Sequence, residues 1–395
     1  MQTENSNAIM VVIGTRLEAI KMAPVVRALR ARFPGRTLLC SSGQHREMLD
    51  QVLDVFSLRP DIDLNVMKPG QDLSELTARI LTGVRSAIRE YRPNAVLVHG
   101  DTTTCLAGSL AAFYEQVPIG HVEAGLRTYN FDHPWPEEMN RRLVDPISTW
   151  CFAPTEQARA NLLAEKVPSD RIHITGNTAI DALLLTLDRQ REDPAEVTGL
   201  DMDRLSDRRT VLVTGHRRES FGEGLKNICW ALRDIAAAVP DVDVVYPVHL
   251  NPRVQQPVNS ILGDQPRVHL LPPQPYPAFV RLMGLSHLII TDSGGIQEEA
   301  PSLGKPVLVT RETTERPEAM QAGVARLVGA KRQCIVDTAV ELLEQEHAYR
   351  AMARAKNPYG DGNAAVRIAE VLKGEALGDS SVSRAATPTM RRQAA

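Results

Sequence analysis

The chain lacks the features that mark membrane proteins and disulfide-rich secreted proteins. No run of roughly 18 apolar residues occurs in its 395 residues, so no membrane span is expected. Nothing within residues 1–30 resembles a signal peptide, because the apolar run AIMVVIG is short and opens a strand-like pattern. The few cysteines are scattered and odd in number: Cys40, Cys105, Cys151, Cys229 and Cys334. They are interpreted as reduced core thiols, and the chain as a cytoplasmic protein that binds no membrane.

The chain also lacks a large excess of either charge and the motifs of several common cofactors. Its 45 basic and 48 acidic residues give a net charge of -3, which argues against a nucleic-acid binder held by bulk charge. No GxGxxG follows the first apolar run and no GxxxxGK[ST] occurs, so neither NAD nor phosphoryl transfer from ATP is expected. His121 and Glu123 form an HxE, but no CxxC follows and no HExxH occurs. We therefore expect no metal and no cofactor.

What the chain does contain is an alternation of short apolar runs with longer amphipathic segments. This alternation predicts parallel sheets that are covered by helices on both faces. A chain of 395 residues exceeds one ordinary core, so we expect an α/β protein of two Rossmann-like, doubly wound domains. The expected strands are 8–14, 37–42, 94–100, 118–125, 149–154, 171–177, 209–216, 243–249, 267–273, 287–292 and 306–310.

Composition also predicts the domain boundaries. The polar, weakly periodic stretch 178–208 is the expected junction between domains 1–177 and 209–360. The helix-like segment 361–374 is expected to pack back on the first domain. The tail, 375–395, holds few large apolar residues, and we expect it to be disordered.

Unusual polar residues gather where the expected strands end. In open parallel sheets ligands bind beyond the carboxyl ends of the strands. Helix caps and ordinary surface charge are the alternative explanation, but they account poorly for so many polar strand ends together. The motifs are GTR (14–16), GQHR (43–46), HGDTTT (99–104), HVEAGLR (121–127), TGHRRES (214–220), YPVHLNP (246–252) and TDSGG (291–295).

The stretch TDSGG predicts a nucleotide site. Ser293 is expected to cap a helix, and Gly294 and Gly295 leave backbone N–H groups open at its start, where a diphosphate binds well. Glu298 and Glu299 follow about one turn later. They either favour the helix dipole or, as in dinucleotide sites, accept the hydroxyls of a ribose.

Three carboxylates form the second group of candidates. Asp101 and Glu123 follow strands of the first domain, and Glu137 lies in HPWPEEMNRR, where Pro136 can open a helix. A helix first-turn acid is the alternative explanation for Glu137. Charge in the first domain and a diphosphate site in the second predict that the domains face a cleft, which is a preferred place for ligands.

Long motifs in this order resemble the non-hydrolysing UDP-N-acetylglucosamine 2-epimerases of bacteria, from about residue 9 to about residue 372. The motifs include GTRLEAIKMAPVVRAL, VHGDTTTCLAGSLAAFY, GHVEAGLRT, PWPEEMNRRL, VTGHRRESFG and TDSGGIQEEAPSLGKPVLV. The resemblance implies a glycosyltransferase-B-like fold, usually in a homodimer. It also implies interconversion of UDP-GlcNAc and UDP-ManNAc, which supplies ManNAc for surface polysaccharides.

The resemblance further implies a route through elimination. The C2 proton of the sugar has no carbonyl beside it, so simple deprotonation is costly. Elimination of UDP gives a 2-acetamidoglucal, and UDP then returns while a proton is added to the opposite face of C2. Two faces require an acid or base on each side. The resemblance assigns Asp101, Glu123 and Glu137 to this set, without deciding which serves which face, and His216 to the departing diphosphate. A histidine satisfied at a strand end is the alternative for His216.

Substrate contacts follow from the same motif positions. Arg16 and Lys21 are implied as cationic contacts, Ser293, Gly294 and Gly295 as the phosphate cradle, and Glu299 as the ribose ligand. Gln274 and Phe279 are implied as uracil contacts, because an amide can pair with a base edge and a phenyl ring can stack. Arg316 is implied as a further substrate-binding arginine. A second, regulatory UDP-GlcNAc is implied at Gln44, His45 and Arg46.

The chain departs from the family pattern in two places. Leu17 stands where the family usually has proline, and the loop LRTYNFDHPWPEE differs from commoner versions before PWPEE. Three other functions remain open from the sequence. They are a glycosyltransferase of the same fold, a hydrolysing 2-epimerase that releases free ManNAc, and a catalytically silent UDP-sugar sensor.

Overall fold

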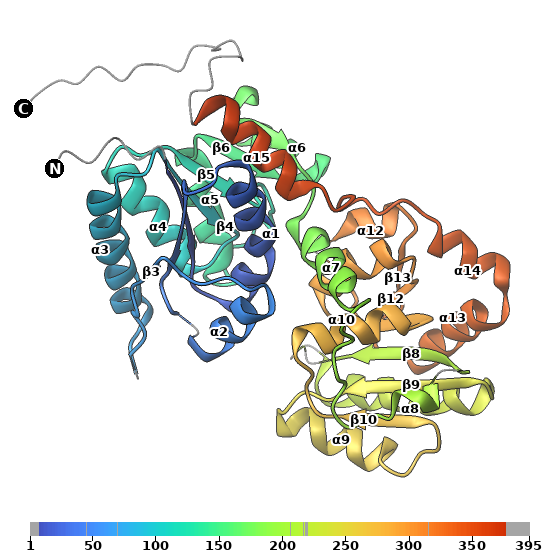
Figure 1. The fold of residues 1–395 in the computed structure, drawn as a ribbon. Helices are drawn as coiled ribbons and strands as arrows, with labels where there is room; N and C mark the ends of the chain where they lie inside the picture. Colours follow the sequence, from blue (N-terminus) through green and yellow to red (C-terminus); the bar gives the residue numbers. More distant parts are fainter. Residues whose placement is uncertain are drawn as a thin grey trace, which may run out of the picture. The chain divides into compact units, whose positions relative to one another are not determined.

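The computed structural model describes residues 8–44, 46–68, 70–205, 207–215, 217, 220–314 and 316–376 (Figure 1). The chain divides into two compact units. The first comprises Met1–Thr178 with Asn363–Ala395, and the second comprises Ala179–Gly362. Each unit contains one sheet, and every strand pair in both sheets is parallel.

The first unit contains a sheet of seven strands in the order β3-β2-β1-β4-β5-β6-β7. Its strands are β1 (Ile9–Ile13), β2 (Thr37–Ser41), β3 (Ile62–Asp63), β4 (Ala95–His99), β5 (Ile119–Val122), β6 (Trp150–Ala153) and β7 (Ile172–Ile174). Its helices are α1 (Arg16–Arg32), α2 (Arg46–Val55), α3 (Leu73–Tyr91), α4 (Thr103–Tyr114), α5 (Glu137–Ile147), α6 (Glu156–Ala164) and α15 (Ala364–Glu375).

The second unit contains a sheet of six strands in the order β10-β9-β8-β11-β12-β13. Its strands are β8 (Arg209–Thr214), β9 (Val242–Pro247), β10 (Val268–Leu271), β11 (Leu288–Thr291), β12 (Val307–Val309) and β13 (Ala325–Leu327). Its helices are α8 (Glu223–Ala238), α9 (Pro252–Leu262), α10 (Tyr276–Leu285), α11 (Gly294–Glu299), α12 (Pro317–Gln321), α13 (Arg332–Glu344) and α14 (Glu346–Ala353), and α7 (Thr178–Arg189) enters this unit from the first.

Successive residues of the central strands pack into cores on opposite faces of the sheet. In β8, Val211 and Val213 belong to one hydrophobic cluster and Leu212 to another. Successive side chains of a strand point to opposite faces, so a strand with two apolar faces reads as a continuous apolar run. The predicted fold class, two doubly wound parallel sheets, is confirmed.

Both sheets reverse their strand order beside their first strand, and this places the functional loops. In the first sheet the reversal lies between β1 and β4, and in the second between β8 and β11. The loops that leave two such strands run toward opposite faces of the sheet, so a crevice opens at their carboxyl ends. The motifs GTR and HGDTTT follow the first pair, and TGHRRES and TDSGG follow the second.

Some features were not expected. The strands β3 and β13 were missed, because they are edge strands of two and three residues without a long apolar run. The stretch 178–208 contains α7, whose Ile180 and Leu183 belong to a core of the second unit. Helix α15, by contrast, lies in the segment that was expected to return to the first domain, and it packs on α1 within the first unit (Figure 1). The predicted disordered tail lies outside the described residues from 377 onward.

The cysteine prediction is correct for four positions and wrong for one. Cys40, Cys105, Cys151 and Cys229 are buried free thiols, whereas Cys334 is exposed. Cys334 lies in the first turn of α13, whose buried residues begin one position later at Ile335. In the described part of the chain, no helix is both long and apolar enough to cross a bilayer.

Candidate active site

Two of the three predicted carboxylates follow neighbouring strands of the first sheet. His99, the last residue of β4, pairs in register with Val122, the last residue of β5. Asp101 lies two residues beyond the end of β4, and Glu123 lies one residue beyond the end of β5. Glu123 adopts a left-handed backbone conformation, with φ of 66°. Such a conformation is uncommon for a residue with a side chain and is often found at functional sites.

Glu123 is bound by Lys21. The ammonium of Lys21, in the second turn of α1, forms an ion pair with Glu123 Oε2, and both side chains are largely buried. A neighbouring ammonium favours the charged form of a carboxylate. The resemblance implies that Lys21 contacts the substrate, but the structure shows that this lysine also acts on a catalytic candidate.

Asp101 is bound by helix α5. Arg141 Nη2 lies 2.5 Å from Asp101 Oδ2, and Asn140 donates a hydrogen bond to the Asp101 carbonyl at 2.7 Å. Burial raises the pKa of Asp101, Arg141 opposes this effect, and the charge of Glu123 adds to it. Asp101 therefore retains a proton more readily than an ordinary aspartate does.

The two glutamates at the start of α5 have different environments. Glu137 is the first residue of the helix and is partly exposed, and no described residue forms a hydrogen bond or ion pair with its carboxylate. Glu138 is fully buried and accepts hydrogen bonds from the backbone N–H groups of Thr128 and Tyr129, each at 3.0 Å. Glu138 thus holds the preceding loop, while Glu137 remains available for a ligand.

A buried charge network lies behind these carboxylates. His121 Nδ1 is 2.6 Å from Asp145 Oδ1, and its Nε2 is 2.7 Å from the Gly100 carbonyl oxygen. Arg127 Nη2 is 2.6 Å from the other oxygen of Asp145. Burial acts to raise the pKa of Asp145, but His121 and Arg127 hold it below its usual range. The His121 ring is therefore held at both nitrogens, between the Asp145 carboxylate and the Gly100 carbonyl.

Glu18 joins the loop after β1 to the loop after β4. Its carboxylate accepts hydrogen bonds from the N–H groups of Gly14 at 3.0 Å and Thr15 at 2.7 Å, and from the hydroxyl of Thr102 at 2.6 Å. Thr15 and Glu18 form a capping box that starts α1, so the helix begins correctly with Leu17 in place of the family's proline. Burial raises the pKa of Glu18 to about 7.

Replacing Glu18 with Gln should therefore change how stability depends on pH. Between pH 4.5 and about 7 the unfolded chain has an ionised Glu18, while the folded chain keeps the proton. Stability thus falls as pH rises through this window, by about 3 kcal/mol in total. Gln cannot titrate, so the free energy of unfolding of Glu18→Gln does not contain this pH dependence. Measured by urea denaturation, the free energy of unfolding of the variant minus that of the unaltered chain should therefore rise by this amount from pH 4.5 to pH 8. A difference that does not change with pH would contradict the raised pKa of Glu18.

The loop after β1 comes close to Thr104, at the start of α4, and this approach requires glycine at position 14. A Cβ built there would lie 2.1 Å from Thr104 Oγ1, which is far inside van der Waals contact. Thr104 in turn donates a hydrogen bond to Gln44 Oε1 at 2.9 Å, so Gln44 belongs to the same loop cluster. Arg16 starts α1 with its side chain exposed. His45 and the side chain of Arg46 lie outside the described residues.

In the second unit, TDSGG starts helix α11 as predicted. Ser293 occupies the N-cap position, but its side chain makes no capping hydrogen bond, contrary to the expected cap. Arg316 Nε lies 2.8 Å from Glu298 Oε1, and a Cβ at position 294 would be 3.1 Å from the Arg316 Cζ atom. Gly294 thus lets the guanidinium approach the start of α11, which adds a cation to the open N–H groups.

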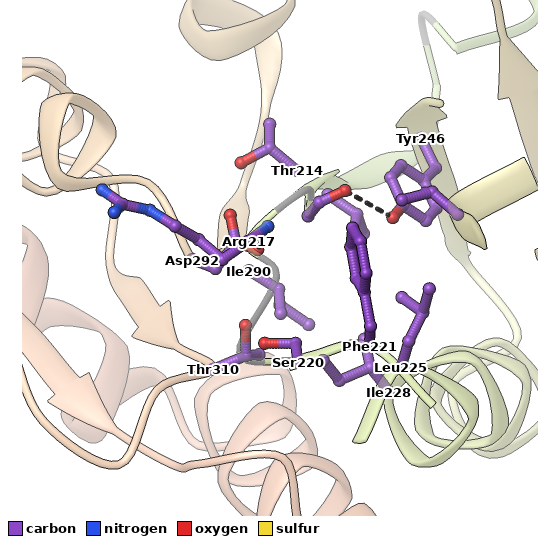
Figure 2. A pocket seen from close by; sticks show the side chains of 13 residues that line it. Thr214, Arg217, Ser220, Phe221, Leu225, Ile228, Tyr246, Ile290, Asp292 and Thr310 are labelled. Carbon is purple, nitrogen blue, oxygen red and sulfur yellow. Dashed lines mark hydrogen bonds between the residues drawn. The ribbon is translucent and has the colours of Figure 1, made fainter. Parts of the chain in front are cut away.

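A pocket adjoins this helix start at the carboxyl ends of β8 and β11. Asp292, which precedes Ser293, is buried and accepts a hydrogen bond from the Arg217 backbone N–H at 2.8 Å. The Tyr246 hydroxyl donates to the Gly215 carbonyl at 3.2 Å, and both bonds hold the loop after β8. Figure 2 shows Asp292 on one side of the pocket, and Phe221, Leu225 and Ile228 on another. The remaining lining residues include Thr214, Ser220, Ile290 and Thr310.

The residues implied as uracil and ribose contacts already interact with other parts of the second unit. The Gln274 side chain accepts from the Thr198 N–H at 3.0 Å and donates to the carbonyls of Thr198 and Pro272. Both of its amide N–H groups are therefore engaged, and only its oxygen retains a free lone pair. Phe279 is partly buried against the core of the second unit. The Glu299 carboxylate lies near Gly295, since a Cβ there would be 3.9 Å from Glu299 Oε1.

Sequence reasoning missed several residues that shape the site, and one predicted residue is not described. The missed residues lie inside the quoted motifs or shortly after them: Glu18, His99, Thr102, His121, Arg127, Arg141, Asp145, Tyr246 and Asp292. His216 lies outside the described residues. Among the described residues, no three His, Cys, Asp or Glu side chains are arranged to hold a metal ion.

Comparison with known proteins identifies the family of the chain. The family model described as UDP-N-acetylglucosamine 2-epimerase matches residues 27–373. The UDP-N-acetylglucosamine 2-epimerase of Escherichia coli (strain K12) is 56% identical over 372 residues, covering 92% of this chain and 98% of that protein. The crystal structure of UDP-GlcNAc 2-epimerase from Neisseria meningitidis, bound to UDP-GlcNAc, is 49% identical with a TM-score of 0.82, covering 93% of this chain and all of that one.

A more distant structure bears on the fold alone. The glycosyltransferase SnogD from Streptomyces nogalater is 17% identical, with a TM-score of 0.61 over 94% of this chain and 99% of that chain. The expected glycosyltransferase-B-like fold is thereby confirmed. The family model matches most of the chain, and a relative of 56% identity covers nearly all of it. The chain therefore belongs to the UDP-N-acetylglucosamine 2-epimerase family.

Proposed function

We propose that this chain is a non-hydrolysing epimerase that interconverts UDP-GlcNAc and UDP-ManNAc without a cofactor. The observation that carries this proposal is the pair of carboxylates at the ends of β4 and β5. Glu123 is paired with Lys21, whereas burial raises the pKa of Asp101. One carboxylate is thus prepared to accept a proton and the other to donate one, as inversion at a carbon requires.

In the proposed reaction, a carboxylate removes the C2 proton while the bond from C1 to the UDP oxygen breaks. The product is a 2-acetamidoglucal and UDP. The acid on the opposite face then protonates C2, and the UDP oxygen bonds again to C1. The environments favour Glu123 as the base and Asp101 as an acid in one direction, with the roles exchanged in reverse. Glu137, partly exposed at the start of α5, is the third member of this set.

The second unit supplies the nucleotide contacts in this proposal. A diphosphate is suited by several groups at the start of α11. They are the N–H groups of Gly294 and Gly295, the Ser293 hydroxyl, which makes no capping hydrogen bond, and the guanidinium of Arg316. His216 is proposed to stabilise the departing diphosphate on sequence grounds. Glu299 is proposed as the ribose ligand, and the Gln274 oxygen, through its remaining lone pair, and the ring of Phe279 as uracil contacts.

Further properties implied by the family complete the proposal. Arg16 is proposed as a cationic substrate contact, and Lys21 as a contact both for the substrate and for Glu123. A second UDP-GlcNAc is proposed to bind at Gln44, His45 and Arg46 and to regulate activity. We also propose that the chain forms a homodimer and that its product supplies ManNAc for surface polysaccharides.

Deuterium incorporation tests the elimination route. Purified protein is incubated with UDP-GlcNAc in D2O, with no cofactor added. UDP-ManNAc should form, and NMR should show deuterium at C2 of both UDP-GlcNAc and UDP-ManNAc. Exchange is expected because the proton leaves C2 on one carboxylate and returns from another. Epimers without deuterium would rule out this route. Accumulation of free ManNAc with stoichiometric UDP would instead identify a hydrolysing enzyme.

A further inference from the structure

Two histidines lie near the carboxyl ends of neighbouring strands of the first sheet, and their environments are opposite. His121 on β5 has an acceptor on each ring nitrogen, so it is fixed in place. His99 on β4 is equally inaccessible, with 4% of its surface exposed. Within the described part of the chain, its Nε2 has no hydrogen-bond partner. A buried polar nitrogen without a partner costs free energy, which indicates a role in another state of the site.

The unpaired nitrogen is directed at a catalytic candidate. His99 Nε2 lies 3.8 Å from Glu123 Oε2, the same oxygen that Lys21 contacts. This separation is slightly too long for a hydrogen bond. Catalytic hydrogen bonds are often long in unliganded enzymes and shorten when substrate binds. A small rotation of either side chain would close the gap.

Burial is the main factor that favours a neutral His99 ring. Burial lowers the pKa of His99 to about 4, and although Glu123 opposes this effect, Lys21 and His121 add to it. Asp101, paired with Arg141, is the other charged group coupled to Glu123. A neutral imidazole carries one N–H group, and a carboxylate oxygen opposite Nε2 favours the tautomer with the proton on Nε2.

We propose that His99 is a positioning residue for Glu123, whose Nε2–H donates a hydrogen bond to Glu123 Oε2 when substrate is bound. This inference rests on the proposed epimerase reaction. The hydrogen bond directs the carboxylate and favours its charged form. His99 itself exchanges no proton with the sugar.

Two substitutions separate this role from simple packing. Gln places an amide N–H close to the position of Nε2, whereas Asn reaches only the position of Nδ1. His99→Asn should lower kcat for UDP-GlcNAc about 10- to 100-fold, the expected effect of one hydrogen bond to a charged group. Its KM should change little, because the proposed nucleotide contacts lie in the other unit. His99→Gln should stay within about threefold of the unaltered chain.

The pH profile gives the decisive readout. Loss of an N–H donor makes the Glu123 carboxylate easier to protonate, so the acid limb of kcat should move up by about one pH unit in His99→Asn but not in His99→Gln. His173 on the edge strand β7 is the matched control; its ring centroid lies 5.8 Å from that of Phe152, with the two rings tilted by 36°. His173→Asn should leave the acid limb in place. Equal loss of kcat in both His99 variants with no shift of the limb would overturn the proposal.

An NMR measurement on the unaltered chain covers the case in which His99→Asn does not fold. The imidazole 15N signals, with His99 assigned from the signal missing in His99→Gln, should show a neutral ring protonated at Nε2 when UDP-GlcNAc is bound. A proton on Nδ1 alone would refute the proposal. If the unaltered chain does not epimerise UDP-GlcNAc at all, it is the proposed function that fails.

Discussion

Glu137→Gln is expected to lower kcat for UDP-GlcNAc by about 10²- to 10⁴-fold, the usual contribution of one general acid or base. Glutamine keeps the shape of the side chain but can neither accept nor donate a proton at neutral pH. No described residue is bound to the Glu137 carboxylate, so the free energy of unfolding should stay within about 0.5 kcal/mol. UDP binding, measured by calorimetry, should be unchanged. Turnover close to that of the unaltered chain would remove Glu137 from the catalytic set.

Glu138→Gln is the matched control, because it makes the same chemical change one residue later. Glu138 is buried, holds the N–H groups of Thr128 and Tyr129, and lies 3.4 Å from the guanidinium of Arg141. Its substitution should lower the free energy of unfolding by about 1–3 kcal/mol, because hydrogen bonds to a charged acceptor are lost. Urea denaturation and steady-state kinetics together should therefore separate a catalytic glutamate from a structural neighbour.

Asp145→Asn is expected to destabilise the first unit by about 3–5 kcal/mol. The Asp145 side chain is fully buried between His121 and Arg127, and loss of its charge leaves the buried guanidinium of Arg127 with less compensation. The measurement is urea denaturation at neutral pH. Because the pKa of Asp145 is lowered from 3.8, its stabilisation is present above that pH and lost as pH falls through the lower folded value. The deficit of the variant should therefore shrink in acid.

Glu165→Gln tests the outer end of the same network. Glu165 also binds Arg127, at 2.7 Å, but its side chain is 17% exposed. Water can reach this carboxylate, whereas the Asp145 carboxylate is fully buried, so its loss should cost less, about 1–2 kcal/mol. A cost of Asp145→Asn no greater than that of Glu165→Gln would show that Asp145 is not the main stabilising residue of the buried charge network.

The fold could be predicted from the sequence because its elements are locally specified. Runs such as AIMVVIG and HLIITD are short and apolar on both faces, which is typical of strands buried between two helical layers. The strands β3 and β13 escaped prediction because a strand of two or three residues has no periodicity to detect. Their place at the sheet edges depends on the neighbouring strand rather than on their own residues.

The catalytic candidates were predicted only in part, and for a similar reason. Asp101 and Glu123 were found because a polar residue directly after a buried strand is conspicuous in the sequence. Asp145 lies inside α5, where an acidic residue looks like ordinary surface charge until the fold buries it. The expected Ser293 cap was wrong in its side-chain contact, because capping depends on a rotamer that the sequence does not specify.

The sequence by itself determined the alternation of strands and helices, the two doubly wound domains and the strand ends at which polar residues gather. Only the tertiary structure decided the partners: Lys21 on Glu123, Arg141 on Asp101, and a buried His99 with an unpaired nitrogen. The physical reason is that periodicity and strand-end position are local properties of the chain. Burial, and the charge that compensates it, depend on residues far apart in sequence that only folding brings together.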